Sequence, residues 1–242
     1  MDSHIVYFGI DPGVTGAVGT IHRGSDWSSY TVDDLPVTTS TFLANQSKSL
    51  DIPRFAEITS QHILKNSHSV ILATEQMQSM GFKTPPKTLT MLAEMAGSIE
   101  ATIRMVCLTR DVPLFIRKYQ PRVWTHWLFP DSEKRSRCKT EAKNESLEKA
   151  RELFPEMHDR LGLKKHHDRA EALLLAFVAL AELQGCVIDR KLKKMSDLVG
   201  MYLLHRQSAR TKEAQFSDIW EADTVRKDLL TDEIITRKSL QQ

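Results

Sequence analysis

Five short runs of hydrophobic residues have the length and composition of β-strands. Two of them are almost continuously apolar, which is typical of strands buried on both faces of a sheet. Glycines between the first two runs favour a tight turn, so these two are expected to pair as a hairpin. The five runs are His4–Ile10, Gly16–His22, Ser29–Leu35, Ser69–Thr74 and Val112–Ile116.

Amphipathic stretches that predict helices separate and follow these runs. The clearest is His167–Leu183, where apolar residues recur at the i, i+3, i+4 and i+7 spacing of one helical face. The order of hairpin, strand, helix, strand, helix, strand and helix predicts an α/β fold whose sheet starts antiparallel and finishes parallel, flanked by helices. The other helical candidates are Lys87–Leu108, Lys139–Phe154, a loose match over Ile52–Lys65, and a turn that opens Tyr119–Phe129.

The composition changes near residue 185. With 242 residues, 41% of them hydrophobic and 26% charged, the chain has the size and composition of a soluble globular protein. We expect residues 1–185 to form one domain and residues 186–242 a charged appendage, helical or partly disordered. No apolar run is long enough to cross a bilayer, so no membrane partner is expected.

The cysteines and the N-terminus bear on the compartment. Cys107, Cys138 and Cys186 are far apart and odd in number, which favours a reducing compartment. The first residues enter a strand pattern at once, which leaves no room for a signal or transit peptide. We expect a cytoplasmic or nucleoid-associated protein, with an organelle as an open alternative.

Two acidic residues end apolar strands. Asp11 follows the first strand and Glu75 follows the fourth. A carboxylate beside a hydrophobic core is unfavourable unless a cation compensates its charge. If the two strands are neighbours, both side chains project from one edge of the sheet and face one another.

A third acidic point opens the clearest helix. At about 100° per residue, His167, Asp168 and Glu171 fall within an arc of roughly 100° beside its apolar stripe. If the stripe packs on the sheet, this arc overlooks the strand ends. Two strand carboxylates with one or two helix ligands would make an oxygen site for Mg²⁺ or Mn²⁺. Two such ions ~4 Å apart can activate water and stabilise the leaving oxygen of a phosphodiester.

Each acidic point also has a simpler explanation. An Asp before Pro-Gly is most often a turn residue, and Glu75 can end a strand at the solvent. Asp168 and Glu171 can be first-turn acids that interact with the helix dipole. The order and spacing of all the acids together favour the metal site.

At these positions the sequence resembles RuvC-type Holliday-junction resolvases of the RNase H-like superfamily. Gly9–Ala17 (GIDPGVTGA) is similar to their opening motif, Ala73–Gln76 (ATEQ) to their second and His167–Leu173 (HDRAEAL) to their last. The last motif is closest to the plant plastid branch, the monokaryotic-chloroplast resolvases. The resemblance covers about Ile5–Leu183.

The resemblance implies a five-stranded RNase H-like sheet, a homodimer and two Mg²⁺ ions per active site, with Mn²⁺ as a substitute. The implied activity is endonucleolytic resolution of four-way junctions by paired symmetric nicks. It maps the catalytic acids onto Asp11, Glu75, Glu171 and Asp168. The plastid branch has a His at the position of His167, so either residue can complete the site. We favour Asp168 because Mg²⁺ prefers oxygen, with His167 carrying a proton or orienting water.

The expected DNA contacts depart from the family pattern. The family often has an aromatic wedge shortly after the acid-Gln pair, and Phe82 is the nearest candidate here. Tyr119–Trp124 resembles a family segment that continues with Lys, but Thr125 stands there. Phosphate contacts are therefore assigned to Lys118 or Arg122.

The net charge of +2 hides a basic segment. Arg117–Arg169 holds 14 basic and 9 acidic residues, where a phosphate backbone would be met. A solvated helical surface gives a similar count. Within the segment, a polar stretch carries the candidates for an arm that lies on phosphates: Lys134, Arg135, Arg137, Lys139 and Lys143.

Three other functions compete with junction resolution. Asp11, Gly13 and Thr15 also fit the first phosphate loop of an actin-like ATPase, but no Asp-Gly pair for a second loop follows Glu75. A nuclease of the same fold that acts on flaps and branched DNA fits the altered wedge and the missing Lys. A junction-binding protein without activity is the third alternative.

The predicted helix Lys87–Leu108 carries the argument for a homodimer. Its apolar residues spread over about 200° of a helical wheel, whereas packing on a sheet needs a stripe of ~100°. Met91 and Met95 lie toward one margin of that band, where an adaptable partner surface is expected. The alternative is that the appendage 186–242 covers the surplus.

Overall fold

The fold is given by a computed structural model, which describes residues 4–24, 28–42, 45–76, 85–129 and 139–183. All but the last few of these residues belong to one unit, Met1–Ala179, and Leu180–Gln242 forms a second. The predicted appendage 186–242 lies outside the described residues and stays a prediction. Within the described part of the chain, no helix has the length and hydropathy needed to cross a membrane.

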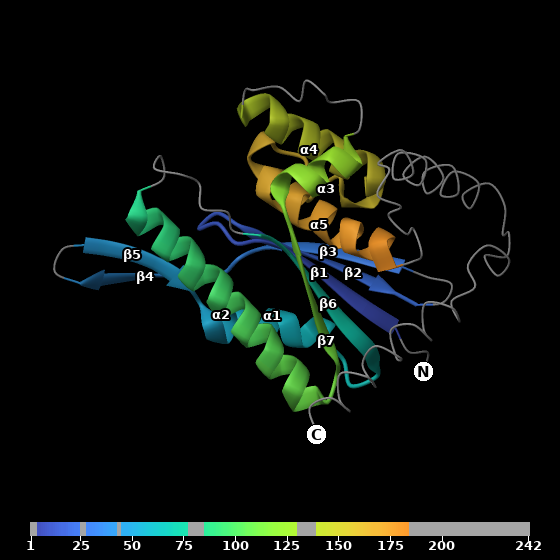
Figure 1. Cartoon of the computed structure of the whole chain (residues 1–242), viewed down its shortest axis with the longest axis horizontal. Coiled ribbons are helices and arrows are strands. Elements are labelled where there is room, and N and C mark those ends of the chain that lie inside the picture. The colour runs from blue at the N-terminus through green and yellow to red at the C-terminus, as the bar shows by residue number, and fades with distance from the viewer. Residues whose placement is uncertain (1–3, 25–27, 43–44, 77–84, 130–138, 184–242) are drawn as a thin grey trace, which may run out of the picture. The chain divides into compact units, whose positions relative to one another are not determined.

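A mixed five-stranded sheet forms the centre of the first unit, in the order β3-β2-β1-β6-β7 (Figure 1). The first three strands pair antiparallel, and β6 and β7 continue the sheet parallel to β1. The predicted α/β class, with the antiparallel start and parallel finish of the RNase H-like sheet, is therefore confirmed. The strands are β1 (His4–Asp11), β2 (Ala17–Arg23), β3 (Ser28–Asp34), β6 (Ser67–Glu75) and β7 (Leu114–Tyr119).

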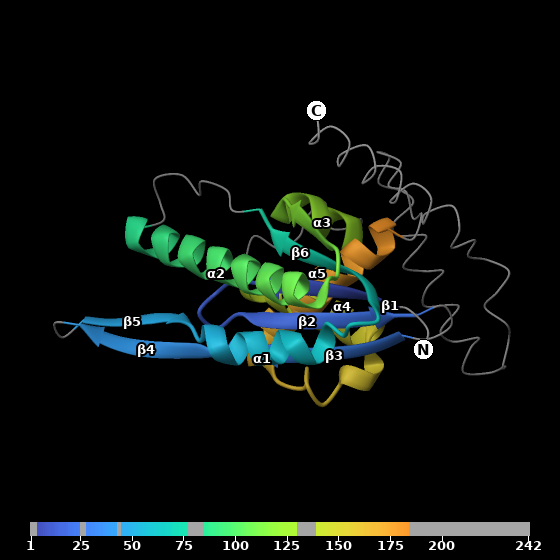
Figure 2. The same cartoon turned by 90° about the horizontal axis from the view of Figure 1, so that it is seen from below.

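Alternate residues of β1 face two different helical layers. Val6, Phe8 and Ile10 belong to a buried core that also contains residues of α1 (Ile52–His62) and α2 (Pro86–Arg110). Figures 1 and 2 show these two helices on one face of the sheet. The residues between them in the strand, ending with Asp11, point to the opposite face because side chains alternate along a strand.

The helix α5 (His167–Leu183) covers that opposite face at very short range. Gly9 and Gly19 are register partners on β1 and β2. A Cβ at Gly9 would lie 2.0 Å from the Ala172 carbonyl oxygen, and one at Gly19 would lie 2.6 Å from the Leu173 nitrogen. The backbone of α5 thus rests directly on the backbone of two strands, which requires glycine at both positions.

Three elements differ from the predicted ones. A polar hairpin, β4 (Val37–Phe42) with β5 (Asn45–Leu50), was not predicted and contacts α2 (Figures 1 and 2). The strand β7 begins after Pro113 and continues through Arg117 and Lys118, because an edge strand tolerates charged side chains. The remaining helices are α3 (Pro121–Leu128), α4 (Lys139–Leu153) and two short 3₁₀ turns, Pro155–Met157 and Lys164–His166.

The exposed face of α2 is not the predicted one. Met95 packs in the core at 3% exposure, so the prediction that it lies on a partner surface is wrong. Ile99, Ile103, Val106 and Cys107 of the same helix are buried in this core as well. The exposed apolar positions follow a different line along the helix, spaced by three or four residues: Ala93, Gly97, Ala101, Met105 and Leu108.

The contact of α5 with the strands predicts a large effect of one methyl group. Gly9→Ala should lower the free energy of unfolding by about 3 kcal/mol or more, because the added Cβ meets backbone atoms that cannot rotate away. Gly162→Ala is the matched control, since its nearest neighbours would lie at 3.4 and 3.8 Å. Urea unfolding followed by circular dichroism measures both. Equal stability of the two variants would contradict the close contact.

Candidate metal centre

A tight turn holds Asp11 at the end of β1. The Gly13 nitrogen lies 3.4 Å from Asp11 Oδ1 as a hydrogen-bond donor, and the Gly16 nitrogen donates to the Gly13 carbonyl at 2.8 Å. A Cβ at Gly16 would lie 2.0 Å from the Asp11 carbonyl oxygen, so the turn closes only on glycine. The turn leaves the carboxylate of Asp11 on the face of the sheet that α5 covers.

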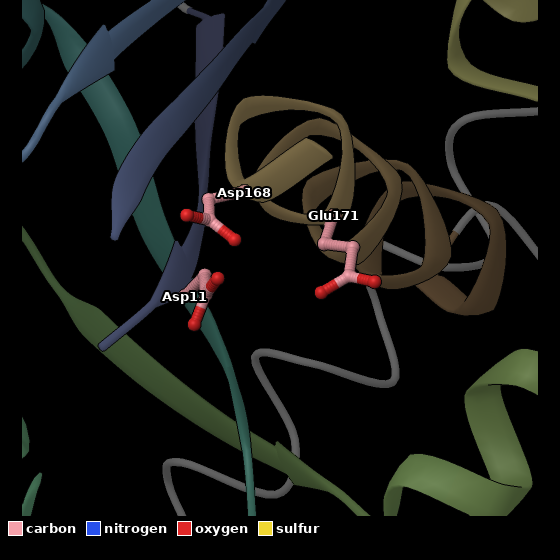
Figure 3. A group of neighbouring side chains, drawn as sticks. All are labelled: Asp11, Asp168 and Glu171. Carbon is pink, nitrogen blue, oxygen red and sulfur yellow. The ribbon is translucent and has the colours of Figure 1, made fainter. Parts of the chain in front are cut away.

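Two acids of α5 meet Asp11 there. One carboxylate oxygen from each of Asp11, Asp168 and Glu171 lies within 4.8 Å of the others. Figure 3 shows the Asp11 and Asp168 carboxylates facing one another, with Glu171 turned toward the same space. Asp168 is buried, and Asp11 and Glu171 are half-buried. The structure therefore brings the first and last sequence motifs together.

Glu75 lies beside this cluster. Ile10 and Thr74 are register partners in the parallel pair β1–β6. Asp11 and Glu75 are the next residues on the two strands, so they lie at the same edge of the sheet. Glu75 is not among the three acids whose oxygens meet within 4.8 Å. Its Oε1 accepts a hydrogen bond from Trp124 Nε1 at 2.8 Å. The role of Glu75 as a metal ligand stays a prediction.

The electrostatics of the cluster are those of an anionic site. Burial and, after it, the charges of Glu171, Asp168 and Glu75 raise the pKa of Asp11 to about 8, against a lowering by the Gly13 N–H. When these carboxylates are ionised together, their negative charges repel one another unless a cation compensates them. The donor set consists of carboxylate oxygens, which fits Mg²⁺ or Mn²⁺.

His167 contacts an acid of the cluster. Its Nε2 lies 2.8 Å from Asp168 Oδ1, and Lys143 of α4 contacts the same ring nitrogen. The Lys143 ammonium is also 3.9 Å from Asp168 Oδ1. His167 is therefore a partner of Asp168, and Lys143, expected on a phosphate-binding arm, places a positive charge beside the acid cluster.

Further contacts that the sequence did not reveal fix the acids in place. Ser146 Oγ of α4 donates to Glu171 Oε1 at 3.3 Å. Arg169, between the two helix acids, donates to both carboxylate oxygens of Asp34 at 2.6 Å. This bidentate pair lowers the pKa of Asp34 and ties the first turn of α5 to the end of β3. Arg169 stood inside a motif, but nothing in the sequence marked Ser146 or Trp124 as partners of acids.

The predicted DNA contacts are placed only in part. Lys118 on β7 pairs with Glu100 of α2 at 3.2 Å and lines a pocket that Glu75 also lines. Arg122 is exposed on the first turn of α3. Four of the remaining candidates lie outside the described residues: Phe82, Lys134, Arg135 and Arg137. For Lys139, the first residue of α4, only the backbone is described.

Three solved structures of junction-resolving enzymes are similar to this chain. The Thermus thermophilus RuvC structure matches at 16% identity and a TM-score of 0.36, covering 72% of this chain and 95% of RuvC. T. thermophilus RuvC in complex with Holliday junction substrate matches at 16% identity and a TM-score of 0.37, covering 74% of this chain and 96% of that chain. The yeast mitochondrial Holliday junction resolvase Ydc2 matches at 13% identity and a TM-score of 0.41, covering 84% of this chain and 85% of Ydc2.

The other two comparisons are negative. No protein-family model matches the sequence, and no curated protein matches it significantly. Identities of 13–16% with TM-scores below 0.5 are too low to transfer an activity.

The geometry around α5 predicts different effects for its two candidate ligands. For the Mg²⁺-supported DNA cleavage that the sequence resemblance implies, Asp168→Asn should lower the rate by more than about 100-fold, because it removes a charge from the acid cluster. His167→Ala should lower it by about tenfold, because it removes only the partner of Asp168. Rates on a branched DNA substrate measure both.

The neighbouring exposed pair supplies controls for these two variants. His158 and Asp159 have exposed side chains, and His158→Ala and Asp159→Asn should both keep the wild-type rate. If His167→Ala abolishes cleavage while Asp168→Asn keeps it, the histidine of the plastid pattern is the ligand and the preference for Asp168 is wrong.

Proposed function

We propose that this chain is a metal-dependent DNA endonuclease that resolves Holliday junctions by paired, symmetric nicks. The observation that carries the proposal is the meeting of Asp11, Asp168 and Glu171, whose oxygens lie within 4.8 Å of one another at one end of the sheet. These are the acids that the first and last resolvase-like motifs contain. Elements 157 residues apart in the chain thus form one oxygen site, as the nuclease interpretation requires.

The chemistry follows from the donor set. We assign Asp11, Asp168 and Glu171 as metal-holding residues, with Glu75 as a fourth. Two bound Mg²⁺ ions, or Mn²⁺ in their place, would activate water and stabilise the leaving oxygen of a phosphodiester. Lys143 contacts His167 beside Asp168, where a proton can be held or passed on at the imidazole. The combined presence of His167 and the RAEALL sequence favours the plastid-like branch of the family.

The DNA-binding surface is proposed to extend from this centre over the basic segment. Arg122 is exposed on α3, and Lys143 reaches the acids from α4, so basic residues approach the site from two helices. The arm Lys134–Lys139 and a wedge at Phe82 remain parts of the proposal. A polyanionic four-way junction would be attracted to these charges at low salt.

A nuclease that acts on flaps and other branched DNA is the second candidate. Thr125 stands where the resembling family segment has Lys, and its hydroxyl donates to the Pro121 carbonyl of its own helix at 2.7 Å. It therefore does not replace the missing phosphate contact. A junction-binding protein without activity and an actin-like ATPase are separated from both nucleases by a cleavage assay.

The decisive experiment uses a synthetic four-way junction, a flap and a matched duplex, each with and without Mg²⁺. We expect paired nicks in the junction only, and only with metal. Asp11→Asn and Glu75→Gln should abolish cleavage while junction binding survives, because each removes metal-binding charge and no phosphate contact. Cleavage by either variant at the wild-type rate contradicts the assignment of that acid, and preference for the flap favours the second candidate.

A homodimer is part of the proposal, with its interface moved to the exposed face of α2. Met105 and Leu108 are 59% and 73% exposed there, which is unusual for large apolar side chains on one helix. A two-fold pair of subunits would present two active sites to the two symmetric strands of a junction.

We therefore expect Ala101→Lys with Met105→Lys to give a folded monomer that makes single instead of paired nicks. Both positions are exposed, so the two lysines leave the core of the subunit intact. Sedimentation at micromolar concentration and nicking of a supercoiled cruciform plasmid measure the two effects. A wild-type protein that sediments as a monomer, both alone and on a junction, rules out the dimer.

A further inference from the structure

The indole of Trp124 contacts the carboxylate that ends β6. Trp124 lies on α3 and is 1% exposed, and its Nε1–H donates to Glu75 Oε1 at 2.8 Å. An indole nitrogen is only a donor, and a buried donor requires an acceptor. The bond therefore connects a helix outside the acid cluster to an acid beside Asp11.

The position of Trp124 is determined by the strand next to Glu75. Tyr119, the last residue of β7, is the register partner of Glu75, and its carbonyl accepts a hydrogen bond from the Gln76 nitrogen at 2.7 Å. The helix α3 begins two residues later, and the Trp124 nitrogen donates to the Gln120 carbonyl at 3.2 Å. A short helix that starts beside Glu75 thus places its first aromatic side chain against Glu75.

Packing holds the indole at that place. Leu128, one turn further along α3, is 2% exposed, so Trp124 and Leu128 anchor the same face of the helix. A rotation of α3 that moved the indole away from Glu75 would expose both side chains. The donor is therefore preorganised, and the orientation of the carboxylate follows it.

We propose that Trp124 is a positioning residue, which orients the Glu75 carboxylate toward the metal centre. The inference rests on the proposed function, because it takes Glu75 as a metal-holding residue. A hydrogen bond from a fixed donor restricts the rotation of the carboxylate before a metal binds. The side chain then loses less conformational entropy on metal binding. Partners of this kind contribute about 10–100-fold to metal affinity or activity.

A purely structural role of Trp124 makes a different prediction. If the indole only fills the core, its replacement weakens metal binding to the same extent whether or not residue 75 is a carboxylate. If it acts through Glu75, the effect disappears once Glu75 is replaced. A double-mutant cycle on metal affinity separates the two cases.

The experiment measures Mn²⁺ binding to the full-length protein by calorimetry without DNA, and junction cleavage separately. Trp124→Phe should raise the Kd for Mn²⁺ by about tenfold and lower kcat with little change in KM. In a Glu75→Gln background, Trp124→Phe should change the Kd by less than about twofold. Trp127→Phe is the control, because Trp127 lies on the same helix and packs edge-on against Tyr119 at 6.0 Å between ring centroids.

A second variant covers the case in which Trp124→Phe does not fold. β-(3-Benzothienyl)alanine at position 124 keeps the shape of the indole and lacks the N–H donor. An unchanged Mn²⁺ affinity of this protein overturns the inference, and so does an equal effect of Trp124→Phe in both backgrounds. Wild-type metal binding and cleavage by Glu75→Gln would instead overturn the assignment of Glu75 in the proposed function, which is a distinguishable result.

Discussion

The candidate site depends on the absence of side chains between α5 and the two strands beneath it. Because Gly9 and Gly19 face each other across β1 and β2, the backbone of α5 can rest on the backbone of the sheet. Only at this distance do Asp168 and Glu171, at the start of the helix, come within 4.8 Å of Asp11. A larger residue at either glycine would lift the helix and separate the acids, whatever ligands they carried.

Each of the three acids is then held in place by partners of its own. Asp11 is held by the Gly13 N–H, Glu171 by Ser146, and Asp168 by His167 and Lys143. These contacts fix the directions of the carboxylates. The Lys143 ammonium offsets one negative charge at most, so burial and mutual repulsion still raise the pKa of Asp11. Such a site stores an electrostatic cost that a divalent cation offsets, and this favours metal binding over a purely structural role for the acids.

The second helical layer serves the site from the other side of the sheet. The helix α2 packs on Phe8 and Ile10, which alternate with Gly9 and Asp11, so the core on one face fixes the strand that presents the acid on the other. The edge strand β7 and helix α3 add Trp124 beside Glu75 and Arg122 at the surface. The proposed metal site and DNA surface therefore share elements, and a change in α3 is expected to affect both.

The sequence by itself determined the five strands of the main sheet and the clear helices, and its motifs marked the acids that meet, because hydrophobic periodicity and short motifs are local properties of the chain. The polar hairpin of β4 and β5 lacks such periodicity and was not predicted. It also indicated the order of antiparallel and parallel strands. It could not decide which atoms meet, since Asp11 and Asp168 become neighbours only when β1, β2 and α5 pack together. The same limit explains the misplacement of Met95, whose helical wheel showed an apolar residue but not which of two faces the sheet would cover. The partners Trp124 and Ser146 were decided by tertiary structure alone, because a hydrogen bond between residues 49 or 25 positions apart leaves no pattern in the sequence.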